Sequence, residues 1–290
     1  MKKLIFFLCI STQLFSQQVI FKGKLVDKET KQPIVYANIS FLNSDKGISS
    51  KENGEFEISI DKKLLESKIH FSCLNYKDTI VLASDLQNKT LYLETKNIEL
   101  KEIVISKKRK KKSILDKVKR RVIPLHSGDN VRMIAKYFPN ELAEDFLIDK
   151  VEIHFSKRNA TKAKFRIRIF SKDLESNFPK EDLLLESIPI SIQKGQRSIE
   201  INLEDYYLSF PKEGVFVVFE KLLIPYNFYE WEESDEKFNK YYAPIIGITN
   251  SNEFKNYKRV SIYSKGKWVE VPMDNGEFSH VPAISLTLSN

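Results

Sequence analysis

The chain has 290 residues, of which 42% are hydrophobic and 30% are charged, and its formal net charge is +8 at pH 7. This composition is typical of a folded globular protein, and the length leaves room for two domains of ordinary size. Beyond the first residues, no stretch carries about 18 consecutive apolar residues, which excludes a membrane-spanning helix there. Phe occurs 20 times and Tyr 12 times, and these aromatic residues favour strands over helices.

Residues 1–17 have the pattern of a secretory signal peptide. Lys2 and Lys3 form a charged start, an apolar run continues to Ile10, and a more polar stretch follows that contains the small residue Ser16. The apolar run is well short of the roughly 20 residues that span a bilayer. We therefore expect cleavage near Ser16 and an exported mature protein that is periplasmic or associated with an outer membrane.

The cysteines support an envelope location. Cleavage removes Cys9 and leaves Cys73 as the only cysteine of the mature chain. A single cysteine forms no internal disulfide, and an exported protein without disulfides is more typical of a bacterial envelope than of the eukaryotic secretory route. Because Cys73 lies between Phe71 and Leu74, we expect it in the hydrophobic core.

Residues 18–96 contain short runs of alternating apolar and polar residues that predict strands. The runs cover residues 21–25, 35–41, 56–60, 68–74, 79–82 and 90–93. Turn residues separate them, and the Asn53-Gly54 pair tolerates the positive φ angles of a tight turn. Short strands separated by turns at this spacing predict a small antiparallel β-sandwich.

Five motif elements occur in order along this unit. They are Gly23 with Asp27, Thr30 with Pro33, Ala37-Asn38-Ile39, Glu52-Asn53-Gly54-Glu55-Phe56, and Phe71-Ser72-Cys73 with Tyr76. In this order they resemble the carboxypeptidase-regulatory-like domain, a transthyretin-like or prealbumin-like β-sandwich that is abundant in exported proteins of Bacteroidetes. The resemblance implies an accessory domain. Residues 97–105 also resemble the segment that follows this domain at the plug of TonB-dependent receptors.

The sequence shows no catalytic constellation. The related zinc carboxypeptidases need a His-x-x-Glu pair, but none of the four histidines has Glu at that spacing or another His at metal-ligand spacing. These histidines are His70, His126, His154 and His280. Gly-x-Ser-x-Gly and glycine-rich phosphate loops are also missing from the sequence. We therefore expect neither an enzyme nor a metal or other cofactor.

The positive charge is concentrated in one segment, which we assign to a linker at residues 97–130. Six consecutive basic residues occur here: Lys107, Lys108, Arg109, Lys110, Lys111 and Lys112. A short amphipathic helix is expected from Ile114 to Ile123. The basic residues are either a solvated hinge or a contact to acidic groups such as an anionic membrane surface. Export argues against nucleic acid as the partner.

Residues 131–290 predict a second strand-rich unit. Its runs cover residues 147–155, 163–170, 183–192, 198–203, 214–219, 260–263, 268–271 and 283–288. Strands with long connections predict a sandwich of jelly-roll type. The residues at 165–170, 202–203 and 214–220 resemble a carbohydrate-binding-like jelly roll of exported Bacteroidetes proteins. The expected fold class is all-β, with two β-sandwich domains joined by a basic, partly helical linker.

Two groups of residues in the second unit are candidates for ligand binding. Lys164, Arg166 and Arg168 alternate with apolar residues, and they form either the solvated face of a strand or a basic stripe for an anionic glycan. A loop near residue 230 is rich in aromatic rings that stack on sugars, anchor a partner protein, or pack beneath the loop. Its candidates are Tyr229, Trp231, Tyr241 and Tyr242.

Together these patterns predict an exported, non-enzymatic binding or scaffolding protein of the bacterial cell envelope. Its expected partner is a glycan or an envelope protein. The alternative is an assembly component associated with outer-membrane TonB-dependent transport machinery.

Overall fold

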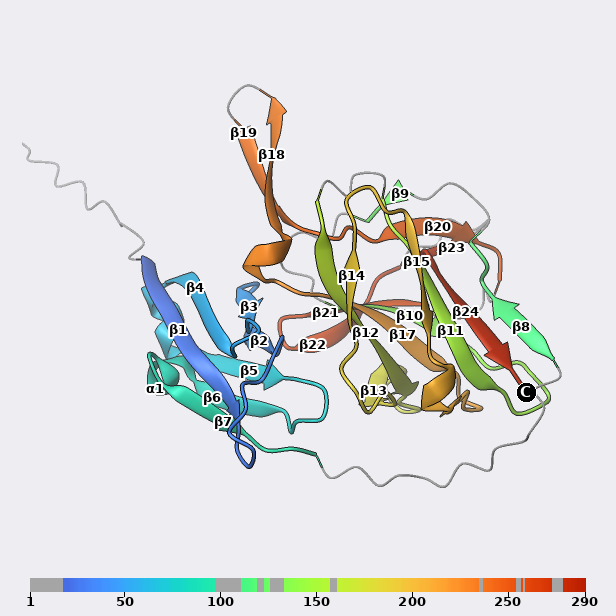
Figure 1. Ribbon diagram of the computed structural model, residues 1–290, viewed down its shortest axis with the longest axis horizontal. Coiled ribbons are helices and arrows are strands. Elements are labelled where there is room, and N and C mark those ends of the chain that lie inside the picture. The colour runs from blue at the N-terminus through green and yellow to red at the C-terminus, as the bar shows by residue number, and fades with distance from the viewer. Residues whose placement is uncertain are drawn as a thin grey trace, which may run out of the picture.

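The computed structural model contains two β-sandwiches that lie side by side (Figure 1). It describes residues 18–96, 111–118, 123–125, 133–156, 161–234, 237–253, 257, 259–272 and 279–290, with backbone only at 231–240 and 279. Strands make up almost all of the regular structure, which confirms the all-β fold class. No helix in the described part of the chain is long and apolar enough to cross a membrane.

The first sandwich is formed by seven strands in two sheets. One sheet has the order β4-β1-β7, and it consists of β1 (Gln18–Asp27), β4 (Glu55–Asp61) and β7 (Thr90–Leu93). The other has the order β3-β2-β5-β6, and it consists of β2 (Asn38–Phe41), β3 (Gly47–Ser49), β5 (Lys68–Ser72) and β6 (Thr79–Leu82). Two single turns of helix, η1 (Lys62–Glu66) and α1 (Ala83–Leu86), connect strands.

A cluster of phenylalanines fills the space between these two sheets. The ring of Phe21 lies 5.4 Å from that of Phe41 and 5.5 Å from that of Phe56, measured between centroids. Gly23 follows on the same face of β1, and a Cβ there would lie 2.6 Å from the ring of Phe56. A glycine is therefore required at residue 23 for the ring of Phe56 to pack against β1.

The second sandwich also has two sheets. The larger has the order β13-β12-β17-β10-β21-β22, and it consists of β10 (Met133–Phe138), β12 (Ala163–Lys172), β13 (Pro179–Asp182), β17 (Val215–Lys221), β21 (Val260–Ser264) and β22 (Lys267–Glu270), with β14 (Pro189–Ile192) also paired to β12. The smaller has the order β15-β11-β24-β8, and it consists of β8 (Lys112–Leu115), β11 (Leu147–His154), β15 (Ser198–Asn202) and β24 (Ile284–Ser289), with β16 (Leu208–Ser209) also paired to β11. The two sheets pack as a sandwich. The resemblance of this second unit to a carbohydrate-binding jelly roll stays a prediction.

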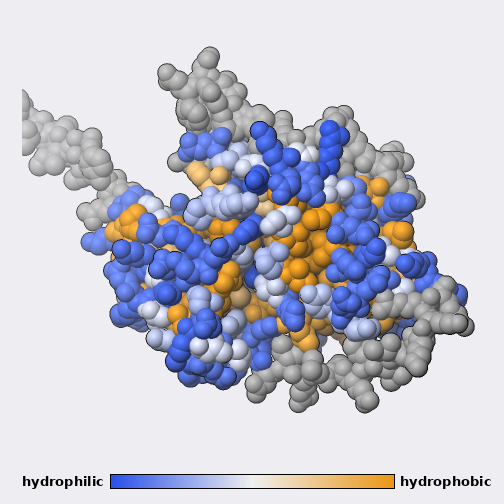
Figure 2. Space-filling model, in the orientation of Figure 1, coloured by the Kyte–Doolittle hydropathy of each residue, from blue (hydrophilic) through white to orange (hydrophobic). Residues whose placement is uncertain are grey.

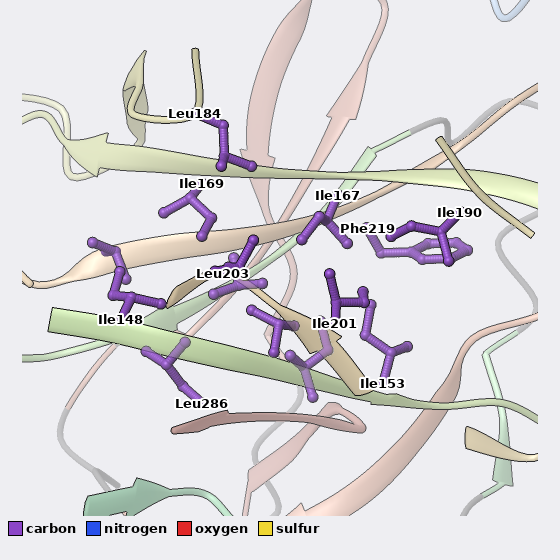
Figure 3. Packing of buried hydrophobic residues seen from close by; sticks show 14 of the residues in the cluster. Ile148, Ile153, Ile167, Ile169, Leu184, Ile190, Ile201, Leu203, Phe219 and Leu286 are labelled. Atoms are coloured by element: carbon purple, nitrogen blue, oxygen red, sulfur yellow. The ribbon is translucent and has the colours of Figure 1, made fainter. Parts of the chain in front are cut away.

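Branched apolar side chains from both sheets form the core of the second sandwich. Figure 3 shows Ile167 and Ile169 of β12 on the side of the cluster opposite Ile153 of β11 and Leu286 of β24. All four side chains are completely buried. Because full burial of such a side chain contributes about 1.5–3 kcal/mol, this cluster is the main source of stability in the second sandwich.

The second sandwich includes residues before 131, where its start was expected. Instead of starting a helix, residues 112–115 form β8, which pairs with β24 near the end of the chain. Ile114 is exposed and Leu115 is buried, which is the alternation of a strand. β9 (Ile123–Pro124) then pairs with β20 (Gly247–Ser251), which also pairs with β23 (Ser279–Pro282). The helix expected from Ile114 to Ile123 is therefore wrong at residues 114–118 and at residue 123, and residues 119–122 lie outside the described part.

The aromatic stretch near residue 230 is a hairpin and not the expected loop. After two short turns of helix, η2 (Glu204–Tyr206) and η3 (Pro225–Asn227), the strands β18 (Phe228–Ser234) and β19 (Lys237–Tyr242) pair with each other. Figure 1 shows this hairpin projecting away from both sandwiches. Its cross-strand neighbours at the base are Phe228 with Tyr242 and Tyr229 with Tyr241, so aromatic pairs favour the hairpin over an irregular loop.

Candidate binding cleft between the two sandwiches

The two sandwiches share an interface with apolar and hydrogen-bonded contacts. Leu223 of the second sandwich is buried within the core of the first, and Leu74 of the first belongs to the core of the second. The backbone N–H of Ser49 donates to the carbonyl of Leu223 at 3.2 Å, and the N–H of Leu223 donates to the Ser49 hydroxyl at 3.1 Å. The interface therefore resembles a continuous core and is not a contact of two wet surfaces.

Arg166 lies beneath this interface. Its Nε and Nη2 each donate to the carboxylate of Glu220 at 2.8 Å, and Nη1 donates to the hydroxyl of Ser187 at 3.0 Å. Nη2 also donates to the backbone carbonyl of Tyr36 in the first sandwich at 3.1 Å. Every contact is within the protein, so the guanidinium joins the two sandwiches.

Arg168, two residues farther along β12, is buried as well. Its Nε donates to Asp182 on the neighbouring strand at 2.6 Å, and its guanidinium lies 4.6 Å from the centroid of the Phe170 ring. Burial raises the pKa of Asp182, although its ion pair with Arg168 opposes that shift. The expected solvent-exposed basic stripe is therefore wrong for Arg166 and Arg168, because protein covers this face of the sheet and acids pair with both side chains.

Next to Arg166, a cleft with a volume of about 350 Å³ opens between the two sandwiches. Four segments line it: the chain before β2 (Tyr36), the turn before β4 (Lys51, Glu52 and Asn53), β12 (Lys164) and the segment around η3 (Ile224, Pro225 and Tyr226). Most of this lining is apolar, with a few polar groups at defined positions. Sites for small molecules have this size and composition.

Three polar side chains bond to one another across the cleft. Lys164 donates to Glu52 at 2.6 Å and to the Tyr36 hydroxyl at 3.1 Å, and that hydroxyl donates to Glu52 at 2.6 Å. The hydrogen bond to Glu52 raises the pKa of Lys164, and the same bond lowers the pKa of Glu52. Both groups are therefore charged at neutral pH. Because Glu52 is mostly exposed, its ion pair with Lys164 contributes little to the free energy of unfolding. The pair instead fixes the positions of the two side chains in the cleft.

Tyr226 supplies the exposed aromatic surface of the cleft. Half of its surface is accessible to solvent (50%). The ammonium of Lys164 lies 5.3 Å from the centroid of the Tyr226 ring and 5.8 Å from that of the Tyr36 ring, within cation–π range. The cleft thus combines an accessible ring with charged groups that donate and accept hydrogen bonds.

The predicted aromatic residues of the hairpin have packing contacts. The rings of Tyr229 and Tyr241 stack at 5.8 Å between centroids, and Tyr229 packs against the core of the second sandwich. Tyr242 packs against the core of the first sandwich and against the ring of Phe228 at 5.4 Å. The side chain of Trp231 lies outside the described residues. A binding role for these residues stays a prediction.

Only part of the predicted basic segment is described. Lys107, Lys108, Arg109 and Lys110 lie outside the described residues. Lys111 forms an ion pair with Glu144, and Lys112 is exposed at the start of β8. Binding of an acidic surface by this segment also stays a prediction.

His70 has contacts in both sandwiches. Its Nε2 lies 3.1 Å from Asp78 in the first sandwich, and its Nδ1 lies 3.1 Å from the hydroxyl of Tyr263 in the second. The residue therefore contributes to the interface. Within the described ranges, no group of three or more His, Cys, Asp or Glu side chains is placed to hold a metal ion.

Sequence reasoning missed most of the cleft. Lys164 is a sequence candidate only as a neighbour of two arginines, Glu52 and Asn53 occur only in a family motif, and Tyr226 only begins the aromatic stretch. Tyr36, Glu52 and Tyr226 come from separate segments, and no spacing in the sequence connects them. The Pro225-Tyr226 pair before an aromatic run is the one local signal for an exposed ring in this region.

Comparison with known families identifies part of the chain. Residues 21–105 match the CarboxypepD_reg-like domain family, which bears out the resemblance of the first sandwich. A domain of this family fits a non-enzymatic binding or scaffold role. No curated protein matches the chain.

One solved structure is distantly similar to this chain. The solved structure of the cysteine protease and lectin-like domains of Cwp84, a surface layer associated protein of Clostridium difficile, is similar with a TM-score of 0.36 and 12% sequence identity. The similarity covers 93% of this chain and 58% of that one, so the chain spans little more than half of that structure. A TM-score of this size supports no conclusion about function.

Proposed function

We propose that this protein, whose residues 21–105 match the CarboxypepD_reg-like domain, is a non-enzymatic carbohydrate-binding protein of the bacterial cell envelope. The cleft between the two sandwiches is its binding site. Export by a signal peptide at residues 1–17 and a location in the periplasm or at the outer membrane are part of the same proposal.

The observation that carries this proposal is the half-exposed ring of Tyr226 beside the Glu52–Lys164 pair. The flat face of an aromatic ring packs well against the apolar face of a sugar ring, and a tyrosine keeps its polar end in water. Around it, Glu52 accepts hydrogen bonds, Lys164 donates them, and the amide of Asn53 does both. Sugar hydroxyl groups need partners of all these kinds.

The contacts within the cleft favour binding without rearrangement. Tyr36, Glu52 and Lys164 already bond to one another, so a ligand does not have to order them. A preformed site loses less conformational entropy on binding. Glu52 and Lys164 neutralise each other, so Lys51 supplies the net charge of the lining. A single lysine side chain attracts anions only weakly in water, so an uncharged saccharide also fits the cleft.

A glycan array tests the proposal. The mature chain is applied to neutral and acidic glycans together with two variants, Tyr226→Ala and Tyr92→Ala. Tyr92 is a matched control because it is also 50% exposed and has a lysine over its ring, Lys31 at 4.9 Å, but it does not line the cleft. We expect the wild type and Tyr92→Ala to bind neutral glycans and Tyr226→Ala to lose that binding.

Two outcomes count against the proposal. If no glycan binds the wild type, or if both variants bind as well as the wild type, the cleft is not a saccharide site. Specific co-purification of an envelope protein without any glycan binding would favour the alternative role in assembly of TonB-dependent transport machinery. Amino-terminal sequencing of the protein from fractionated cells tests export.

A further inference from the structure

A second cavity, with a volume of about 190 Å³, lies in the second sandwich where the chain leaves β8 and β20. Seven residues line it: Asp116, Lys117, Thr249, Asn250, Ser251, Asn252 and Glu253. None of them belongs to the cleft between the sandwiches. In Figure 1, β8 and β20 are on the side of the second sandwich that faces away from the first.

Asp116 is held in place at the floor of this cavity. Its carboxylate accepts hydrogen bonds from Arg259 and Ser251, and it lies 3.1 Å from the ammonium of Lys136. Its backbone N–H donates to the carboxylate of Glu253 at 2.7 Å. Asp116 has a φ of 50°, a left-handed conformation that these contacts hold in place.

Thr249 lines the same cavity and has an unsatisfied hydroxyl. Only 5% of the residue is accessible to solvent, and its Oγ1 has no hydrogen-bond partner in the described part of the chain. A buried hydroxyl without a partner costs about 1–3 kcal/mol. Native proteins rarely leave such a group unpaired. We therefore expect either water or a ligand to occupy the cavity and to form a hydrogen bond with this hydroxyl.

The polar groups of the cavity extend from its buried floor to an exposed rim. Thr249, Ser251 and Asp116 are buried, whereas Asn252 and Glu253 are exposed. The cavity is therefore reached from solvent on a side with amide and carboxylate groups. By liquid volume it has room for about six water molecules, which is enough for a small organic molecule.

The charges around the cavity argue against a metal cation. Lys136 and Arg259 are buried next to the single buried carboxylate of Asp116, and both direct their charge at it. Burial lowers the pKa of Lys136 to about 7, because Asp116 offsets only part of the cost of burying the ammonium. With the exposed pair Lys117 and Glu253 also of opposite sign, the surroundings carry no excess negative charge for a cation.

We infer that this cavity is a binding site for a small, uncharged, hydroxyl-rich molecule, such as a polyol or a single sugar unit. The hydroxyl of Thr249 and the amide groups of Asn250 and Asn252 both donate and accept hydrogen bonds, whereas the Ser251 hydroxyl is already bonded to Asp116, Arg259 and Glu253. Ligand hydroxyls have the same property and give Thr249 the partner that it lacks. This inference does not rest on the cleft, which is lined by other residues.

Calorimetric titration of the mature chain tests the site with glycerol, D-glucose and D-mannose as probes, and with calcium chloride as the competing hypothesis. Thr249→Val replaces the hydroxyl with a methyl group of similar size, and Asn252→Ala changes an exposed rim residue. We expect at least one of the three hydroxylated probes to bind, with affinity at least tenfold lower in each variant. Tyr92→Ala, which lies outside both the cavity and the cleft, should bind that probe as the wild type does, and Tyr226→Ala reports any binding in the cleft.

Melting temperatures control for folding. Because the Thr249 hydroxyl has no partner in the described part of the protein, Thr249→Val removes no internal hydrogen bond there and should melt close to the wild-type temperature. Three results would overturn the inference: none of the hydroxylated probes binds, calcium binds and they do not, or the two cavity variants bind them as tightly as the wild type. If Tyr226→Ala alone loses the probe, the molecule binds in the cleft and the inference is also wrong.

Discussion

Arg166 and Glu220 are opposite each other on β12 and β17, and the guanidinium donates two hydrogen bonds of 2.8 Å to the carboxylate. Both side chains are buried. The same guanidinium reaches the backbone of Tyr36 in the other sandwich. One ion pair therefore satisfies a buried acid and also links the two domains on either side of the cleft.

This arrangement predicts a large effect of breaking the pair. Arg166→Met removes the guanidinium that donates two hydrogen bonds to the buried Glu220 carboxylate, so the free energy of unfolding should fall by about 3–5 kcal/mol. Urea denaturation measures this change. The double variant Arg166→Met/Glu220→Leu removes both charges and should recover much of the loss. If the double variant is no more stable than the single one, the uncompensated charge is not the cause.

Because of the position of Leu223, we expect the two sandwiches to unfold together. It belongs to the second sandwich but is buried in the core of the first. Leu223→Ala removes this contact and should cost about 2–5 kcal/mol. Differential scanning calorimetry should then show one transition for the wild type and two for the variant. Leu174→Ala is the control, because Leu174 is 69% exposed, and it should behave as the wild type. Two transitions in the wild type would contradict the shared core.

We expect that the first sandwich has no room for a side chain at residue 23. In Gly23→Ala, the new Cβ would lie 2.6 Å from the ring of Phe56 and 2.9 Å from the carbonyl oxygen of Lys89. Overpacking of this kind should destabilise the protein by about 1–3 kcal/mol in urea denaturation. Phe56→Leu in the same chain relieves the ring contact, so the loss from Gly23→Ala should be smaller in that background. An equal loss in both backgrounds would assign the effect to the backbone and not to the ring.

Lys136 predicts that stability depends on pH. Burial lowers its pKa to about 7 in the folded protein from an ordinary value of 10.5. Between these two values the unfolded chain binds more protons at this group than the folded protein does. The contribution of Lys136 to the free energy of unfolding therefore rises as pH increases through this window. Lys136→Met should remove that rise.

Urea denaturation at several pH values between 7 and 10.5 measures the effect as the difference between wild type and Lys136→Met. The difference isolates Lys136 from the other lysines and tyrosines that titrate there. A difference that stays constant with pH would show that Lys136 keeps its ordinary pKa in the folded protein.

The sequence predicted strands better than it predicted what covers them. Alternation in residues 163–170 correctly indicated a strand, and Arg166 and Arg168 occupy one of its faces. Their burial depends on the first sandwich and on neighbouring strands, whose positions no local pattern reports. In the same way, Lys112–Leu115 pairs with a strand about 170 residues later, whereas the local spacing of apolar residues favoured a helix.

The candidate site was less predictable than the fold for the same reason. The cleft joins Glu52 from a turn, Lys164 from a strand and Tyr226 from a short helical turn. Each residue type is common in its local setting, and only the contact between the two sandwiches brings them together. In contrast, Tyr229 and Tyr242 are binding candidates from the sequence because they are aromatic. In the structure, both pack against a hydrophobic core.

Calorimetric titration with the saccharide that binds the mature protein best, compared between Tyr226→Ala and Tyr92→Ala, tests most directly whether the cleft binds saccharides. If the cleft is the binding site, Tyr226→Ala should raise the dissociation constant at least tenfold, a loss of about 1.4 kcal/mol, while Tyr92→Ala should leave it unchanged. Equal dissociation constants for the two variants would contradict the assignment of the cleft as the saccharide site.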